Sequence, residues 1–333
     1  MAIRNETEYV YASARIRAAD GKDTAKIRLD RMLDCRSPEQ LFRTVLEMGF
    51  LSEEHKQPDT LTEALDLAWE DAVALVKNNV PEPSVYDFLL YKYDCNNIKV
   101  ALKAAILGLD YSGLYYACGT FSPKDLTGRL AADDTAGLPH HMAEAVAEAR
   151  SAYAQTGEGR AIDFCLDRAC YGDMAEKAAE TEVPLFREYV AAKADITNIL
   201  SSVRLAARGT KEASAAVFAQ AFVPGGTLPA ELFTDCGCPG YEELRERLDA
   251  GMLKDTVDRI LARGEDARPE KEFDNAVYRL MNRDRYVPFG IHVPAVFLVN
   301  REAELKNCRI IAAGLEAGVS PAGLRERIRV DYV

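Results

Sequence analysis

The sequence predicts an all-α protein built from two or three linked domains. Apolar residues recur three and four positions apart over long segments rich in Ala, Leu, Glu and Lys, which places them on one face of a helix. Four such segments, at 61–77, 85–107, 184–208 and 293–315, are too long for strands, and no convincing run of alternating residues accompanies them. A chain of 333 residues is also longer than one compact core usually holds.

Short sequence signals predict where helices begin and where they break. A Ser-Pro pair marks a helix start, because the serine can cap the helix and proline suits its first position. These pairs are Ser37-Pro38, Ser122-Pro123 and Ser320-Pro321, and Gln40 completes a capping box in the first of them. Clusters rich in Gly and Pro predict loops at 132–139, 223–229, 235–240 and 262–269. Two of these loops are candidate domain joints.

Composition and charge narrow the class of protein. With 48% hydrophobic and 28% charged residues the chain can bury a core. A net charge of −12 disfavours binding to nucleic acid, and it disfavours attraction to anionic lipid by bulk charge. Residues 1–12 lack the apolar core of a signal peptide, so we expect a cytoplasmic protein. Apolar stretches such as 293–299 are far shorter than the roughly 18 residues needed to cross a bilayer, so membrane association is expected to go through another protein.

Cysteine and histidine usage gives little support for a metal site. Eight scattered cysteines are expected to be reduced thiols. Cys236 and Cys238 lie in a turn, but no second cysteine pair or spaced histidines follow to complete a zinc site. His140 and His141 are expected to be exposed in a loop. The remaining histidines, His55 and His292, have no evident chemical partner.

The sequence also lacks the usual signatures of an enzyme. It contains no Gly-x-x-x-x-Gly-Lys-Ser/Thr phosphate loop, no Gly-x-Gly-x-x-Gly fingerprint after a strand and no His-Glu-x-x-His helix. Its carboxylates are dispersed at helical spacing, which suits solvated faces better than an acid and base pair. We therefore expect no catalytic residue, no cofactor and no metal.

The most informative feature is an internal repeat with a period of about a hundred residues. An acidic residue is followed three positions later by Asn and eleven positions after that by Gly. The three copies are Asp94/Asn97/Gly108, Asp195/Asn198/Gly209 and Glu304/Asn307/Gly318. A further acidic residue lies 33 to 35 positions before each asparagine, at Glu63, Asp163 and Asp274. A pair of helices is therefore repeated, and we predict helical repeat domains at 1–125, 126–233 and 234–333.

The repeated residues share one helix face, because steps of three and four keep side chains together. Small residues on this face let a neighbouring helix approach closely. Asparagine has poor propensity inside a helix, so its recurrence predicts an amide bonded to a partner helix or loop. This structural interpretation is favoured over a binding role. Basic residues recur nearby, at Lys99, Lys103, Arg204 and Arg309. Solvated or salt-bridged faces explain most of them, and a partner-facing role is the alternative.

Several blocks of the sequence, in order along nearly the whole chain, resemble one known family. They are Tyr9-Val10-Tyr11-Ala12-Ser13-Ala14-Arg15-Ile16-Arg17-Ala18, Tyr93-Asp94-Cys95-Asn96-Asn97-Ile98-Lys99, Asp195-Ile196-Thr197-Asn198, Pro288-Phe289-Gly290, Glu302-Ala303-Glu304-Leu305-Lys306-Asn307-Cys308-Arg309, Leu324-Arg325-Glu326-Arg327-Ile328 and Tyr332-Val333. The family is that of the C subunits of V/A-type (vacuolar/archaeal-type) rotary ATPases, whose eukaryotic members are the V-ATPase d subunits. None of the blocks is a catalytic signature.

The resemblance implies a funnel of three similar helical domains around a pseudo-threefold axis, in agreement with the repeat. It also implies a non-catalytic central-stalk protein that links the rotor shaft to the membrane ring of proteolipid subunits. Such a protein couples ATP hydrolysis or synthesis to H⁺ or Na⁺ transport and associates with the membrane through the complex. The alternative is a general all-helical scaffold or adaptor. Solenoid scaffolds usually repeat every 30 to 50 residues, whereas these units are about a hundred residues long.

Overall fold

A computed structural model describes residues 6–20, 25–55, 57–235 and 237–330, and within these ranges the chain is helical with no strand. The all-α prediction is confirmed. Contacts divide the chain into two compact units, residues 1–84 with 274–333 and residues 85–273. The three predicted repeat domains remain a prediction, because these units cut the chain at other positions.

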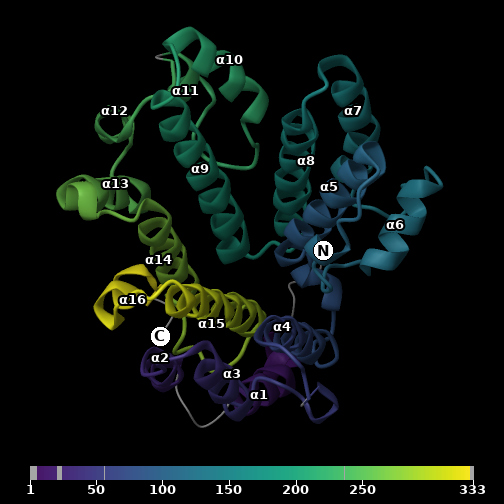
Figure 1. Ribbon diagram of the computed structural model, residues 1–333, viewed down its shortest axis with the longest axis vertical. Helices are drawn as coiled ribbons and strands as arrows, with labels where there is room; N and C mark the ends of the chain where they lie inside the picture. Colours follow the sequence, from purple (N-terminus) through teal and green to yellow (C-terminus); the bar gives the residue numbers. More distant parts are fainter. Residues whose placement is uncertain (1–5, 21–24, 56, 236, 331–333) are drawn as a thin grey trace. The chain divides into compact units, whose positions relative to one another are not determined.

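The first unit is organised around one long helix, α15 (His292–Glu316). This helix contacts α1, α2, α3, α4 and α16, and the ribbon shows it in yellow-green between these neighbours (Figure 1). The neighbouring helices are α1 (Val10–Ala19), α2 (Ala25–Leu33), α3 (Pro38–Glu47), α4 (Leu61–Lys77) and α16 (Pro321–Arg327). Short 3-10 turns at Glu6–Tyr9 and Glu53–His55 complete the N-terminal part. Buried aliphatic residues along α15 form much of this core.

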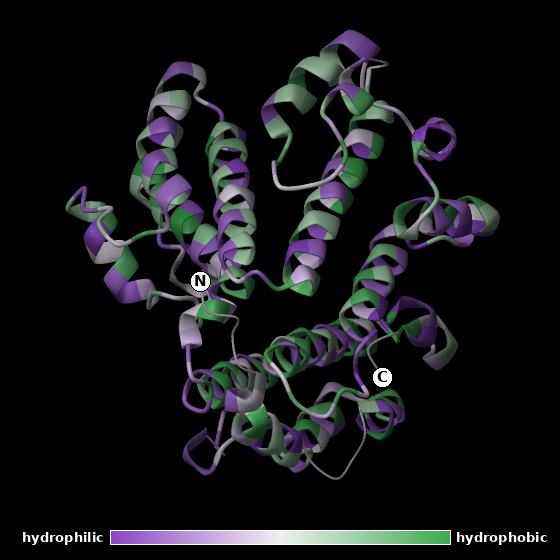
Figure 2. Cartoon of the chain, turned by 180° about the vertical axis from the view of Figure 1, so that it is seen from behind, coloured by the Kyte–Doolittle hydropathy of each residue, from purple (hydrophilic) through white to green (hydrophobic). Residues whose placement is uncertain are grey.

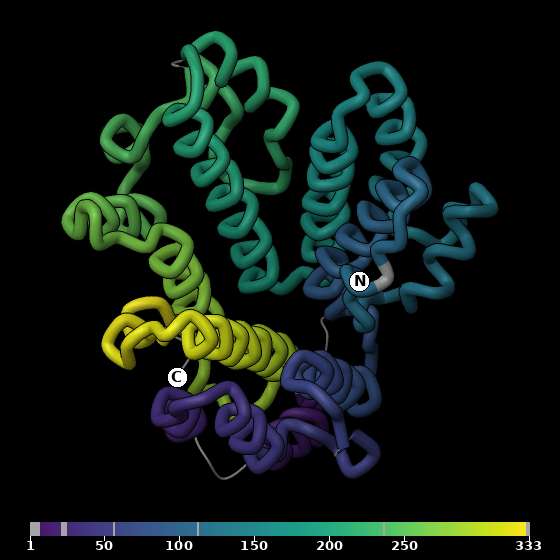
Figure 3. The backbone as a smooth tube through the Cα atoms, in the orientation of Figure 1, coloured from purple at the N-terminus to yellow at the C-terminus, as the bar shows by residue number. Residues whose placement is uncertain are grey.

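The second unit contains three long consecutive helices. Helices α7 (His140–Thr156) and α8 (Gly159–Glu180) form an antiparallel hairpin, and the backbone tube doubles back between them (Figure 3). Helix α7 ends at Gly157, whose φ is +68°. Helix α8 also packs against α5 (Tyr91–Leu107) and α9 (Pro184–Ala206). The remaining elements are η4 (Ser112–Leu114), α6 (Pro123–Ala131), α10 (Lys211–Ala221), α11 (Glu231–Thr234), α12 (Tyr241–Arg247), α13 (Met252–Arg263) and η5 (Gly264–Asp266).

Two elements cross the boundaries between the units. They are η3 (Pro83–Leu89) and α14 (Pro269–Met281). Green and purple residues alternate around the long helices, as expected for helices that bury one face (Figure 2). Aromatic side chains fill part of the second unit, where the ring of Phe88 lies 5.0 Å from that of Phe186 and 6.1 Å from that of Tyr189, between centroids.

The sequence signals for helix starts were accurate at the Ser-Pro pairs. Ser37, Ser122 and Ser320 cap α3, α6 and α16, each accepting a backbone hydrogen bond with Pro in the first turn. The predicted helix at 61–77 matches α4 in its bounds, and those at 184–208 and 293–315 differ from α9 and α15 by one or two residues.

Three local predictions were wrong. The segment 85–107 is not one helix, because its first part is the 3-10 turn η3, which buries Val85, Tyr86, Phe88 and Leu89. Neighbouring residues such as these cannot all share one face of an α-helix. His140 and His141 lie in the first turn of α7 and not in a loop, and His140 is exposed whereas His141 is half-buried. Here Asp173 on α8 accepts hydrogen bonds from the backbone N–H of His141 and Met142, which caps α7 from outside.

His55 has a partner after all, since its Nδ1 lies 2.9 Å from Oδ1 of Asp71.

Candidate functional site: a repeated helix-to-loop clamp

Each of the three repeated asparagines holds a segment that follows its own helix. Asn97, Asn198 and Asn307 are fully buried, on α5, α9 and α15. Each side chain donates to the carbonyl oxygen of one downstream residue and accepts from the same residue's N–H. The partners are Tyr116 (2.8 and 2.9 Å), Val223 (2.9 and 3.0 Å) and Arg329 (2.7 and 2.8 Å). The hydrogen bond predicted for each side-chain amide is therefore made to a backbone segment that follows the helix and returns to pack against it.

The acidic residue one turn before the asparagine binds the same returning segment in the first two copies. Asp94 accepts hydrogen bonds from Thr120 N (2.9 Å), Thr120 Oγ1 (2.6 Å) and Phe121 N (3.2 Å). Asp195 accepts from Thr227 N (3.0 Å), Thr227 Oγ1 (2.7 Å) and Leu228 N (3.0 Å). A buried carboxylate needs such donors, because burial without them is costly. We call each set of Asp, Asn and bonded segment a clamp.

A glycine before each threonine makes this approach possible. A Cβ on Gly119 would lie 2.2 Å from Oδ1 of Asp94, and one on Gly226 would lie 2.1 Å from Oδ1 of Asp195. Both distances are far inside van der Waals contact, and the carboxylates are fixed by their hydrogen bonds. The Gly-Thr pair is thus a functional part of the clamp that the sequence motifs did not reveal. Its signal was present, since Gly-Thr precedes a helix-start motif in both copies.

We expect Gly119→Ala to lower the free energy of unfolding by about 1–3 kcal/mol, because the new methyl group must displace the loop or the Asp94 carboxylate. Gly128→Ala on α6 is the matched control, since a Cβ there meets nothing within 4 Å. That control should be neutral or up to about 1 kcal/mol stabilising, because alanine favours a helix over glycine. Urea unfolding of both variants measures the difference, and equal stabilities would contradict the clamp geometry.

In the third copy, the acidic residue pairs with arginine side chains and not with N–H and O–H groups of a returning segment. Glu304 is 1% exposed, and its Oε1 lies 2.7 Å from Nε of Arg28 while its Oε2 lies 3.2 Å from Nη1 of Arg301. Burial raises the pKa of Glu304, and the two arginines oppose that rise without overcoming it. Arg28 and Arg301 both reach Oδ1 of Asp20 at 3.1 Å. The result is a charge cluster joining α2 to α15, in which Arg28, Arg301 and Glu304 are buried and Asp20 is half-exposed.

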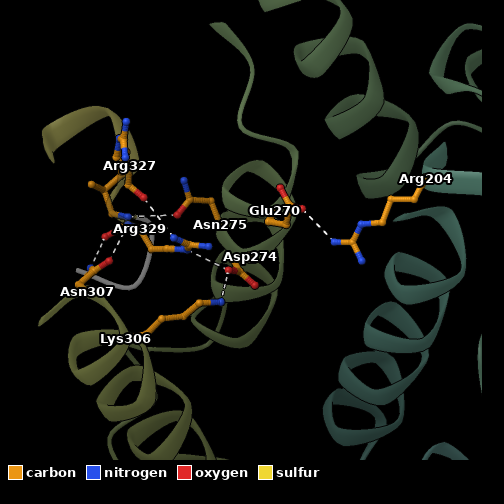
Figure 4. A network of polar contacts seen from close by, with 9 residues as sticks. Arg204, Glu270, Asp274, Asn275, Lys306, Asn307, Arg327 and Arg329 are labelled. Carbon is orange, nitrogen blue, oxygen red and sulfur yellow. Dashed lines mark hydrogen bonds and ion pairs between the residues drawn. The ribbon is translucent and has the colours of Figure 1, made fainter. Parts of the chain in front are cut away.

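The upstream acidic residues of the repeat do not share one role. Glu63 belongs to the N-terminal cap of α4, where Thr60 caps the helix and the Glu63 carboxylate accepts from Asp59 N at 2.8 Å. Asp163 pairs with Lys103 at 2.6 Å. Asp274 pairs with Lys306 at 2.6 Å and with Arg329 at 2.9 Å (Figure 4). Of the three, only Asp274 reinforces a segment held by a repeated asparagine, because its partner Arg329 is also hydrogen-bonded to Asn307.

The repeated basic residues form ion pairs between different copies of the repeat. Each pair joins the asparagine helix of one copy to the upstream helix of another. The pairs are Lys99 with Asp167 (2.5 Å), Lys103 with Asp163, Arg204 with Glu270 (3.0 Å) and Arg309 with Asp66 (2.8 Å). Figure 4 shows Arg204 reaching Glu270 on α14. The sequence predicted salt-bridged faces but not this regular pattern of partners.

The three repeated glycines divide into two kinds. Gly108 and Gly318 have φ of +63° and +67°, the left-handed region that ends a helix and favours glycine. Gly209 has no positive φ, and a Cβ there would approach Ser214 Oγ at 3.3 Å. Gly314 lies on the same helix face, and its lack of a side chain lets Leu324 on α16 pack against it. A Cβ added at Gly314 would lie 2.2 Å from Cδ2 of Leu324.

Other candidate sites have structural explanations. Across the described ranges, one group of potential metal ligands comes together, formed by His141, Asp173 and Glu176. Both oxygens of Asp173 already accept backbone N–H groups at 2.8 Å, so its geometry is that of a helix cap. Cys238 is buried, whereas Cys236 and the terminal Tyr332-Val333 lie outside the described residues. Of the helices that are described, none is both long and apolar enough to span a membrane.

The fold and the clamps define an all-α protein whose buried polar side chains hold its own backbone segments in place. Similarity to known sequences then identifies its family. The chain belongs to the ATP synthase (C/AC39) subunit family, whose sequence profile matches residues 12–327. The resemblance noted in the sequence is therefore confirmed. The chain is a subunit of a rotary ATPase and not an enzyme by itself.

Individual relatives are distant but cover most of the chain. It is 22% identical to the C subunit of the A-type ATP synthase of Thermococcus onnurineus, over 97% of this chain and 90% of the relative. It is 23% identical to the C subunit of the A-type ATP synthase of Methanocaldococcus jannaschii, over 95% and 85%. It is also 22% identical to the C subunit of the V-type sodium ATPase of Enterococcus hirae, over 77% and 78%.

Proposed function

We propose that this chain is the non-catalytic central-stalk subunit that links the rotor shaft of a V/A-type ATPase to its membrane ring of proteolipid subunits. In this role it couples ATP hydrolysis or synthesis to transport of H⁺ or Na⁺. It is a cytoplasmic protein that associates with the membrane through the complex, in three helical repeat domains arranged as a funnel. The match of the family over residues 12–327 is the observation that carries this proposal.

The clamps support a mechanical role. A protein that transmits torque must do so without local unfolding, which requires its loops to be fixed to its helices. Asn97 and Asn198 fix returning segments with two hydrogen bonds each, and Asp94 and Asp195 each accept from three further donors. The buried polar residues of the repeat thus have partners inside the chain, which fits a transmitting element better than a catalyst.

Affinity purification of the tagged chain from native membranes tests the proposal. We expect detergent extracts to yield the shaft and proteolipid subunits of a rotary ATPase in stoichiometric amounts, because both would contact this protein. A tagged chain bearing Asn97→Leu provides a comparison, since a loosened first clamp should reduce recovery of partners. Recovery of unrelated client proteins instead would favour the general scaffold, and the coupling proposal would then be wrong.

A further inference from the structure

A pocket of about 640 Å³ opens in the second unit, between α6 and the segment that the first clamp holds. One wall contains Tyr115 and Ala117, which flank Tyr116, and the other wall is a face of α6. Asn97 binds both backbone groups of Tyr116, and Asp94 binds the two residues just before the cap of α6. The first clamp therefore fixes both walls, and a preformed pocket lowers the entropy cost of binding.

The wall formed by α6 is a helix face of mostly small residues. Lys124, Thr127, Gly128 and Ala131 follow each other at steps of three, one and three, so they share one side of the helix; all four line the pocket and are exposed. The buried leucines of α6 belong to another face, and the helix packs on α5. A helix face turned only to solvent usually carries several charged residues. This face carries one.

Gly128 stands in the middle of this face. Glycine is a poor helix former, so a glycine inside a helix is usually explained by close packing. The described part of this chain does not supply that explanation, because a Cβ at Gly128 would meet no atom within 4 Å. A second helix that crosses α6 at this point does, because a missing side chain lets two helix backbones approach closely.

Two polar groups of the pocket are available to a partner. Among the residues that the structure describes, the Lys124 ammonium group forms no ion pair or hydrogen bond, and the Tyr115 hydroxyl forms no hydrogen bond. The ammonium group carries a positive charge, and both groups donate hydrogen bonds, so both suit a carboxylate. The other lining residues are small or apolar. The pocket therefore complements an apolar helix face that carries an acidic residue.

We propose that the pocket between α6 and the segment 115–117 binds an amphipathic helix of another subunit, with an acidic side chain paired to Lys124. The helix crosses α6 at Gly128, and its apolar side chains fill the pocket. A second copy of this chain is a poorer occupant, because two chains of net charge −12 repel each other. The inference rests on the proposed function, since it assigns to this surface one of the protein contacts that a linking subunit needs.

Photo-cross-linking in the assembled complex tests this contact. The probe is p-benzoylphenylalanine placed at Ala131, an exposed pocket residue at the end of α6. The complex is purified from native membranes through the tagged chain and irradiated, and mass spectrometry maps the cross-linked peptide. We expect one peptide of another subunit, with apolar residues at helical spacing and an Asp or Glu among them. The same probe at Ala147, an exposed residue of α7 outside the pocket, should not give this cross-link.

Variants of the pocket should lower the yield of that cross-link. Lys124→Glu should lower it at least about fivefold, since an attraction becomes a repulsion, and Lys26→Glu on α2 is the matched control at an exposed lysine. Gly128→Leu should lower it by a similar factor, because leucine blocks the close approach, and Ala147→Leu is its control. Neither pocket variant should lower the melting temperature of the purified chain, because neither position has a contact inside the described chain that the new side chain removes.

A charge exchange then separates a direct pair from a general loss of structure. Replacing the mapped acidic residue of the partner with Lys should restore the cross-link to the Lys124→Glu chain. A yield no higher than at Ala147, cross-linking to a second copy or to lipid, or equal losses in the controls would overturn the helix contact and leave the coupling role intact. Failure of the unsubstituted tagged chain to recover rotary ATPase subunits would overturn both proposals.

Discussion

Replacing Arg28 with Met should lower the free energy of unfolding by about 3–5 kcal/mol at pH 7, because it leaves the buried Glu304 carboxylate with one of its two arginines. Arg28 is 3% exposed, and it also donates to the carbonyl oxygen of Asp20 at 2.7 Å. Methionine fills a similar volume, so the loss is electrostatic and not a cavity effect. Urea unfolding measures the change.

Arg31→Met on the same helix is the matched control. Arg31 pairs with Glu47 at 3.1 Å, but the two side chains are 36% and 68% exposed. Such a surface pair contributes up to about 1 kcal/mol, because solvent screens it. If Arg31→Met and Arg28→Met destabilise the protein equally, the buried cluster has no special role.

The loss caused by Arg28→Met should depend on pH. The pKa of Glu304 is raised in the folded protein, so its carboxyl group favours folding when protonated and loses that contribution as pH rises through the folded pKa. Without Arg28 the folded pKa rises further. The deficit of the variant should therefore be largest near pH 7 and smaller near pH 4, close to the ordinary glutamate pKa of about 4.3. A deficit independent of pH would show that Glu304 is not the group responsible.

Asn97→Leu should cost about 2–5 kcal/mol of unfolding free energy. Its side chain satisfies both the N–H and the carbonyl oxygen of Tyr116, and removing it leaves two backbone groups without partners, at about 1–3 kcal/mol each. Leucine is also a poor match for a polar surrounding. Chemical denaturation gives the loss, and hydrogen exchange at Tyr116 should increase because its N–H no longer donates to Asn97.

The neighbouring residue provides the control for this prediction. Asn96→Leu removes one hydrogen bond, from Nδ2 to the carbonyl oxygen of Leu114 at 3.2 Å, at a partly exposed position. Water can replace that bond, so the expected cost is within about 1 kcal/mol. A similar loss in Asn96→Leu and Asn97→Leu would mean that the effect comes from the apolar side chain and not from the clamp.

Local sequence signals determined the helices well. Ser-Pro pairs and the 3.6-residue period predicted α4, α6, α16 and most of α9 and α15, because capping and amphipathicity act over a few residues. They were wrong at α7, which begins at His140 because Asp173 caps it from another helix. Asp173 lies more than thirty residues away in sequence, so no local pattern could reveal it.

The repeat shows the same division. The sequence by itself predicted that Asn97, Asn198 and Asn307 are equivalent, because each has the same spacing to an acidic residue and to a glycine. It also predicted that each amide has a partner, because an asparagine inside a helix is otherwise unfavourable. Only the tertiary structure decided what that partner is, a backbone segment 19 to 25 residues downstream. It also decided that Glu304 pairs with Arg28, 276 positions earlier in the chain. Hydrogen bonds and ion pairs depend on distance in space, and the sequence records only distance along the chain.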